Sequence, residues 1–145
     1  MSAESEHLTA AIGTERFTAK LQHGLAPRSC ERLMASLPYV GKVIHARWSG
    51  EALWSPLGAA FPPGLLLPPE HPRGEPAPGE ILLYAGELSE PELLVVYGTS
   101  RFACKAGPLE GNPVLLIEEG LERLARLGRE VLWGGAMELR IERTR

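Results

Sequence analysis

A short run of polar side chains, from His45 to Glu51, carries most of the chemistry that can be read from this chain. His45, Arg47 and Ser49 recur at the period of two that places side chains on one face of a β-strand. An imidazole can transfer protons near neutral pH, and a guanidinium binds carboxylates through paired hydrogen bonds. Glu51 adds a carboxylate and Trp54 adds a flat apolar surface. Together these groups predict a pocket for a small polar molecule, with Arg47 as its anion contact.

The same residues also have structural interpretations that the sequence leaves open. His45 can be hydrogen-bonded within the sheet, and Arg47 can pair with Glu51 on a solvated strand face. Trp48 lies on the opposite face of the expected strand, where we predict that it packs in the core. Gly50 interrupts the run and indicates a β-bulge or a close backbone approach.

Three residues further along the chain are additional candidates for ligand contacts. Tyr97 ends an apolar run directly before a glycine, and Arg101 begins the next expected strand. Asn112 lies between a glycine and a proline, so it is either a turn residue or a hydrogen-bonding group in a pocket. The candidate catalytic residues are therefore His45, Arg47 and Glu51. The candidate ligand-binding residues are Trp54, Tyr97, Arg101 and Asn112.

Other kinds of site are not indicated. The four histidines are scattered without metal-ligand spacing, and no phosphate-binding loop or nucleophile elbow occurs, so we expect neither a metal nor another cofactor. The net charge is −3 without a basic run, which argues against nucleic acid as a partner. No apolar run approaches the roughly 20 residues of a membrane span. The acidic N-terminal stretch has no features of a secretion signal, and we expect a cytoplasmic protein with Cys30 and Cys104 as free thiols.

The spacing of apolar residues predicts a mainly β protein with two helices. We expect one domain over residues 1–145, with a loose tail at 1–6. The helices are expected at 26–37, ended by Pro38, and at 118–128, ended by Gly128. The expected strands cover 7–12, 16–22, 43–49, 81–84, 93–97, 101–105, 114–117, 131–133 and 137–142. This pattern predicts a closed β-barrel of about eight strands, capped by the two α-helices.

Residues 55–79 are predicted to form a long loop. They hold eight of the thirteen prolines, which prevent regular structure, yet they also contain Phe61 and the apolar run 65–67. A pocket lid or a subunit interface would account for such apolar residues in a loop. A loop that merely lies over the barrel is the alternative.

Two segments of the chain resemble cyclophilins. HGLAPRSCERLMASLP is similar to the cyclophilin helix entry, and YVGKVIHARW is similar to the segment that contains their Phe-His-Arg motif. His45 takes the histidine position, whereas the catalytic arginine of cyclophilins would fall on Ala46, one residue before Arg47. The chain resembles even more a family of uncharacterised bacterial cyclophilin-like proteins, through IHARWSGEALW, PGE, VVYG, GPLEGNP and VLWGGA. This resemblance implies a cyclophilin-like barrel in a cytoplasmic homo-oligomer and brings no established reaction.

Three functions follow as hypotheses. The first is a cyclophilin-like barrel, without isomerase activity, that binds a small polar or anionic molecule in a groove formed by the candidate residues. The second is a peptidyl-prolyl cis-trans isomerase with an altered active site, in which Arg47 supplies the positive charge. The third is a structural or accessory subunit that docks through the loop at 55–79.

Overall fold

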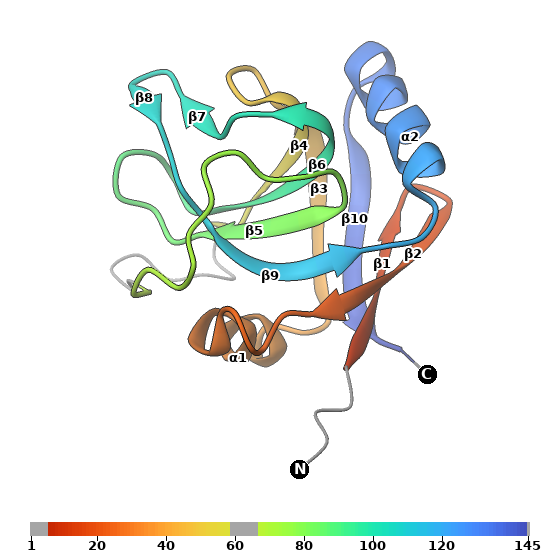
Figure 1. Cartoon of the computed structure of the whole chain (residues 1–145). Helices are drawn as coiled ribbons and strands as arrows, with labels where there is room; N and C mark the ends of the chain where they lie inside the picture. Colours follow the sequence, from red (N-terminus) through yellow and green to blue (C-terminus); the bar gives the residue numbers. More distant parts are fainter. Residues whose placement is uncertain (1–5, 59–66, 145) are drawn as a thin grey trace.

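The computed structural model describes residues 6–58 and 67–144. Eight strands close into an antiparallel barrel in the order β1-β10-β3-β4-β6-β5-β9-β2 (Figure 1). Their bounds are β1 (His7–Ile12), β2 (Glu15–Leu21), β3 (Tyr39–His45), β4 (Gly50–Pro56), β5 (Glu80–Tyr84), β6 (Glu92–Ser100), β9 (Asn112–Ile117) and β10 (Met137–Arg143). A small hairpin of β7 (Ala103–Cys104) and β8 (Gly107–Pro108) stands apart from the barrel sheet. With α1 (Pro27–Ala35) and α2 (Leu121–Gly134), this architecture confirms the predicted barrel with two helices.

The sheet is buried on both faces along β4, β6 and β5. Within β6, Leu93 and Val95 belong to the barrel interior, whereas Leu94 and Val96 belong to a second apolar cluster on the outer face. This alternation explains why the strand is a continuous apolar run, since both of its faces exclude water. Phe102 and Leu109, from the segment that carries the small hairpin, complete the outer cluster. The candidate site lies at the edge of this outer cluster.

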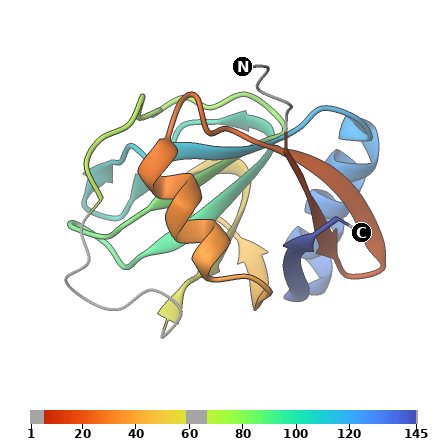
Figure 2. The same ribbon diagram turned by 90° about the horizontal axis from the view of Figure 1, so that it is seen from below.

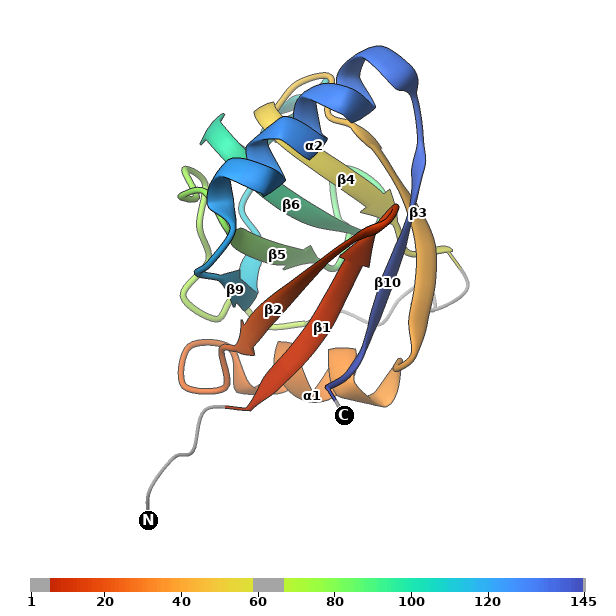
Figure 3. The ribbon, with the colours of Figure 1, turned by 90° about the vertical axis from the view of Figure 1, so that its right-hand side faces the viewer.

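The two helices cover opposite ends of the barrel. Figure 2 shows α1 across one end, and Figure 3 shows α2 along the other. The apolar stripe of α1 turns Cys30 and Leu33 into the barrel interior, with Met34 partly buried beside them. A proline in the first turn suits the start of this helix, because the missing N–H has no partner there in any case.

The second helix is longer than predicted, and the prediction of a strand at 131–133 is wrong. The helix passes through Gly128 and ends at Gly134. Gly128 lies directly against the ring of Tyr97, where a side chain would have no room. The glycine therefore allows close packing of helix and barrel, and it does not end the helix. The predicted strand at 101–105 is reduced to Ala103–Cys104.

The strand expected at 43–49 ends at His45, and a corner of irregular backbone follows. The predicted core position of Trp48 is wrong, because this side chain is 53% exposed. Gly50 has a φ of 77°, and the pairing of β4 with β6 shifts register just after it, which confirms the predicted bulge.

The structure describes residues 55–58 and 67–79 of the predicted proline-rich loop. The first two residues of the predicted range, Ser55 and Pro56, belong to β4. Leu67 packs against the interior cluster, and Arg73 pairs with Gly111 in an isolated bridge. The other apolar residues predicted to need burial, at positions 61, 65 and 66, lie outside the described residues. Within residues 6–58 and 67–144, no helix is long and apolar enough to cross a membrane.

Candidate functional site

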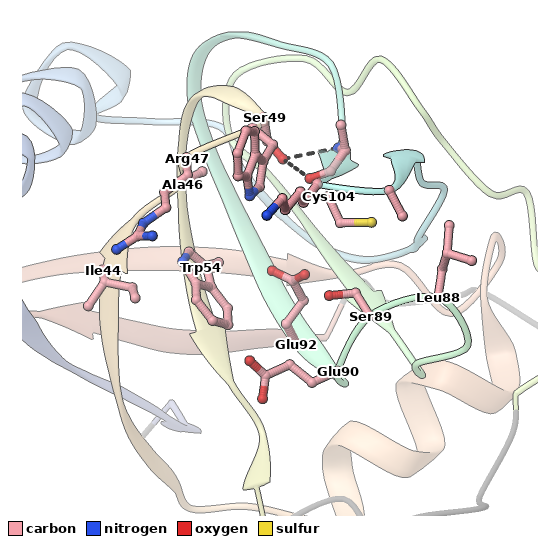
Figure 4. Close-up of a pocket in the computed structure, with 14 residues that line it drawn as sticks. Ile44, Ala46, Arg47, Ser49, Trp54, Leu88, Ser89, Glu90, Glu92 and Cys104 are labelled. Carbon is pink, nitrogen blue, oxygen red and sulfur yellow. Dashed lines mark hydrogen bonds between the residues drawn. The ribbon is translucent and has the colours of Figure 1, made fainter.

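A pocket of about 400 Å³ opens on the outer face of the barrel (Figure 4). Three segments and one side chain line it: residues of the 44–49 corner, residues 88–92 at the start of β6, residues 103–106 of the hairpin, and Trp54. This volume is at the lower end of the range that small-molecule sites occupy. We refer to it below as the outer-face pocket.

The floor of the outer-face pocket is a row of side chains across the sheet. Ile44 pairs with Trp54 between β3 and β4, and Trp54 pairs with Leu94 between β4 and β6. Residues that are paired across neighbouring strands turn their side chains to the same face. Trp54 therefore continues the outer apolar cluster to its edge, where the indole is only partly covered.

Ser49 fixes the corner that carries Arg47 and Trp48. Its side chain is 3% exposed, and its hydroxyl donates to the carbonyl oxygen of Ala103 (3.0 Å) and accepts from the N–H of the same residue (3.1 Å). The hydroxyl of Ser100 donates to the carbonyl oxygen of Ser49 (2.7 Å). These bonds tie the corner to the end of β6 and to the hairpin, so two walls of the pocket hold each other in place.

Tyr84 shapes a third wall. Its hydroxyl oxygen lies within hydrogen-bonding distance of three successive backbone N–H groups, those of Glu87 (3.0 Å), Leu88 (2.8 Å) and Ser89 (3.2 Å). Its ring packs edge-to-face on Phe102, with 5.6 Å between the centroids. The loop before β6 is thus curled around one buried hydroxyl, which sets the position of the side chains that face the pocket.

Glu92 was not predicted as a site residue, and neither were Ser89, Glu90 and Lys105, which line the same pocket. Glu92 is the first residue of β6 and is 7% exposed, yet no described residue supplies a hydrogen bond to its carboxyl oxygens. Burial, and to a lesser degree the nearby charge of Glu90, raises the pKa of Glu92 to about 7. The available signal was its spacing from Leu94 and Val96, which puts it on the same outer face as the apolar cluster.

Arg47 and Trp54 are the two predicted site residues that line this pocket. His45 and Tyr97 are also brought together, but elsewhere, with 2.7 Å between Nε2 and the hydroxyl oxygen. His45 Nδ1 is 2.8 Å from the carbonyl oxygen of Ala46. A carbonyl oxygen can only accept, so Nδ1 carries a proton, and in the neutral ring Nε2 accepts from the tyrosine. Burial, reinforced by the charge of Glu51, raises the pKa of Tyr97, which therefore stays a neutral phenol.

The remaining three predicted residues lie apart from the outer-face pocket. Glu51 accepts from the N–H of Thr99 (2.8 Å), and Arg101 forms an ion pair with Glu75 (3.0 Å). Asn112 is buried at 7% exposure. Its amide nitrogen donates to Ser29 Oγ (2.9 Å) and to the carbonyl oxygen of Pro68 (3.0 Å), and its amide oxygen accepts from the N–H of Glu70 (3.0 Å). The seven predicted side chains therefore do not surround one groove.

The described residues contain two free cysteines and no cluster of metal-ligating side chains. Within them, no group of three or more His, Cys, Asp and Glu side chains could hold a metal ion. Cys30 and Cys104 are both free, as predicted. Cys30 is fully buried on the inner face of α1, whereas Cys104 is partly exposed and lines the outer-face pocket.

Comparison with solved structures shows a shared fold. McbB, whose structure was solved in complex with tryptophan, superposes with a TM-score of 0.72 at 23% identity. The match covers 94% of this chain but only 44% of McbB. The hypothetical protein AF2241 from Archaeoglobus fulgidus, solved in solution, matches with a TM-score of 0.63 at 11% identity, over 99% of this chain and 100% of that one. Both neighbours have cyclophilin-like folds.

Sequence comparison shows the family. None of the curated proteins matches this chain significantly. Residues 8–142 match the family model described as a protein of unknown function, DUF3830. This range runs from the first strand to the last and includes every wall of the outer-face pocket. The chain therefore belongs to the DUF3830 family.

Proposed function

We propose that this protein binds a small amphipathic molecule in the outer-face pocket. The observation that carries the proposal is the pairing of two partly exposed indoles, Trp48 and Trp54, with two cationic side chains, Arg47 and Lys105, around one pocket. A flat apolar group fits against the indoles, and an anionic group fits the cations. The ligand class is the one predicted from the sequence, a small polar or anionic molecule. Its proposed site is the outer-face pocket, in which Arg47 and Trp54 are the only residues of the predicted groove.

The exposure of Trp48 supports this proposal. A tryptophan that is 53% exposed leaves a large apolar surface in water, which is unfavourable unless something covers that surface. The corner that carries Trp48 is held by the buried hydroxyl of Ser49, so the indole is presented on fixed backbone. Preorganised aromatic surface of this kind loses little conformational entropy when a ligand binds.

The cations keep their hydrogen-bond donors available. Arg47 and Lys105 are exposed, and neither forms an ion pair or a hydrogen bond with any residue in the described ranges. A ligand carboxylate could therefore bind without breaking an existing contact. The fold neighbour McbB binds tryptophan, a flat molecule with a carboxylate, and this suggests indole compounds as the first probes.

A direct titration tests the proposal. We expect L-tryptophan or 3-indolepropionate to bind the wild type in isothermal titration calorimetry. Trp48→Ala and Arg47→Ala should each weaken that binding by about tenfold, the effect of losing about 1.4 kcal/mol of contact energy. Trp133→Ala is the matched control, because this tryptophan is 87% exposed on α2 and does not line the pocket. Equal weakening by the control, or no binding by any indole compound, would refute the proposal.

The other two hypotheses stay predictions. Proline-containing peptides in the same titration, followed by an isomerisation assay, test the altered-site isomerase. Light scattering tests the predicted homo-oligomer. Pull-down with the 55–79 loop intact and shortened tests docking through that loop.

A further inference from the structure

We propose that the ligand of the outer-face pocket carries a protonated amine, which Glu92 and Glu90 bind beside the indole of Trp54. This inference rests on the proposed function and adds the chemical class of the second ligand group. It concerns the end of the pocket formed by the loop before β6 and the start of that strand.

Glu92 carries a buried carboxyl group that has no partner among the residues the structure describes. Its side chain is 93% buried, being 7% exposed, and no described residue donates a hydrogen bond to its carboxyl oxygens. In Figure 4 the carboxyl group points into the space between Trp54 and Ser89. A buried carboxylate is normally paired, because removing its charge from water is costly. A cation supplied by a ligand would provide the pairing that the described residues do not.

The groups around Glu92 favour a cation over an anion at the end of the pocket where β6 begins. Glu90 lines the same pocket and contributes a second negative charge, which helps to raise the pKa of Glu92. An ammonium group would neutralise this repulsion and could also lie against the face of an indole, where a cation is attracted to the ring. Ser89 adds a hydroxyl that can accept a hydrogen bond from the same group.

The charges of Arg47 and Glu92 are separated along the pocket. Figure 4 places Arg47 and Glu92 on opposite sides of Trp54. The Arg47 guanidinium and the Glu92 carboxyl are thus separated by an apolar wall, while Lys105 lines the pocket from the hairpin next to Cys104. This arrangement matches a flat molecule with an amine at one end, and a carboxylate at the other end would add the contact to Arg47.

Binding of an amine should release a proton near neutral pH. Four other titratable or charged groups line the pocket: Glu90, Arg47, Cys104 and Lys105. Tyr84 lies opposite Glu92 on the neighbouring strand. The free carboxyl is only partly ionised near pH 7, and a bound ammonium stabilises its ionised form. Apparent affinity then follows the ionised fraction, so the Kd of a permanently protonated amine should fall about tenfold from pH 6 to pH 8.

Three indole probes separate this inference from the proposed function. Tryptamine carries only the amine, 3-indolepropionate only the carboxylate, and 3-indolepropionamide neither. We expect the wild type to bind tryptamine more tightly at pH 8 than at pH 6. Glu92→Gln should weaken tryptamine binding at pH 8 by at least about tenfold and abolish its pH dependence. The same variant should leave 3-indolepropionate binding within about twofold. Glu87→Gln, an exposed carboxylate of the same loop outside this pocket, should change neither.

The outcomes are distinguishable. Binding of 3-indolepropionate or the amide without binding of tryptamine would overturn the amine inference and leave the pocket as a ligand site. Tryptamine binding that Glu92→Gln does not change would also overturn it. If none of the probes binds, the proposed function and this inference fail together. Circular dichroism of Glu92→Gln confirms that the variant is folded before binding is compared.

Discussion

Replacing Glu92 with glutamine should stabilise the folded protein at alkaline pH and leave its stability almost unchanged at acid pH. Glutamine has nearly the shape of the protonated side chain but never carries the buried charge. Residue Glu92 is 7% exposed and its carboxyl group has no hydrogen-bonding partner among the described residues, so its ionised form is less well solvated than in the unfolded chain.

The sign and size of the effect follow from proton linkage. The pKa of Glu92 rises from the ordinary 4.5 to about 7 in the folded protein, mainly through burial. Between these values the folded state binds more protons than the unfolded state, so unfolding free energy falls as pH rises. The contribution is fully present below pH 4.5 and is lost once pH exceeds 7. A rise of about 2.5 in the pKa, at about 1.4 kcal/mol for each pH unit, corresponds to about 3 to 4 kcal/mol of unfolding free energy.

Urea unfolding at pH 5 and at pH 8.5 measures this difference. The variant should match the wild type within about 1 kcal/mol at pH 5 and exceed it by about 3 kcal/mol at pH 8.5. Comparing the two proteins at each pH cancels the titration of all other groups. Glu87→Gln, in which an exposed carboxylate is replaced, should show no such pH-dependent gain. If Glu92→Gln shifts stability equally at both pH values, the carboxyl is not desolvated and the reasoning fails.

Two other predictions concern packing and thiol reactivity. Gly128→Ala should destabilise the protein by about 2 to 3 kcal/mol in urea unfolding, because its new methyl group would overlap the ring of Tyr97. Gly134→Ala, which adds the same group to open space on the same helix, should stabilise by up to about 1 kcal/mol, and an equal loss in both variants would contradict the packing argument. A thiol reagent at pH 8 should modify Cys104 in the native protein and leave Cys30 unmodified until denaturant is added, since burial raises the pKa of the Cys30 thiol to about 12. Equal reaction rates of the two thiols in the native state would contradict this.

The strands and the first helix could be predicted because their signals are local. The strand predicted at 7–12 and the helix predicted at 26–37 match β1 and α1 to within about two residues. Local signals failed at Gly128, since a glycine near the end of an apolar stripe usually marks a helix end. Gly128 is needed here because it packs against the ring of Tyr97, which lies 31 positions earlier in the chain. A contact between residues so far apart cannot be predicted from the neighbouring sequence.

Only part of the candidate site was predicted, because only some of its residues have a signal in the neighbouring sequence. Arg47 was predicted from strand periodicity and Trp54 from its flat apolar side chain close by, and both line the outer-face pocket. Trp48 was assigned to the core because the strand was expected to continue, whereas the backbone turns away after His45. Glu92 was missed because its burial depends on a loop that Tyr84 holds and on the distant hairpin at 103–106.

The sequence alone determined where most strands lie, which faces are apolar and that the chain is a barrel with two helices, because alternation and helical spacing are properties of neighbouring residues. The tertiary structure decided which polar side chains meet. It joined His45 to Tyr97 across 52 positions and held Asn112 in the packing around Ser29. It also placed Glu92, whose carboxyl group has no partner among the described residues, in a pocket lined by two tryptophans. These pairings depend on strand order and loop course, which are fixed only when the whole barrel closes.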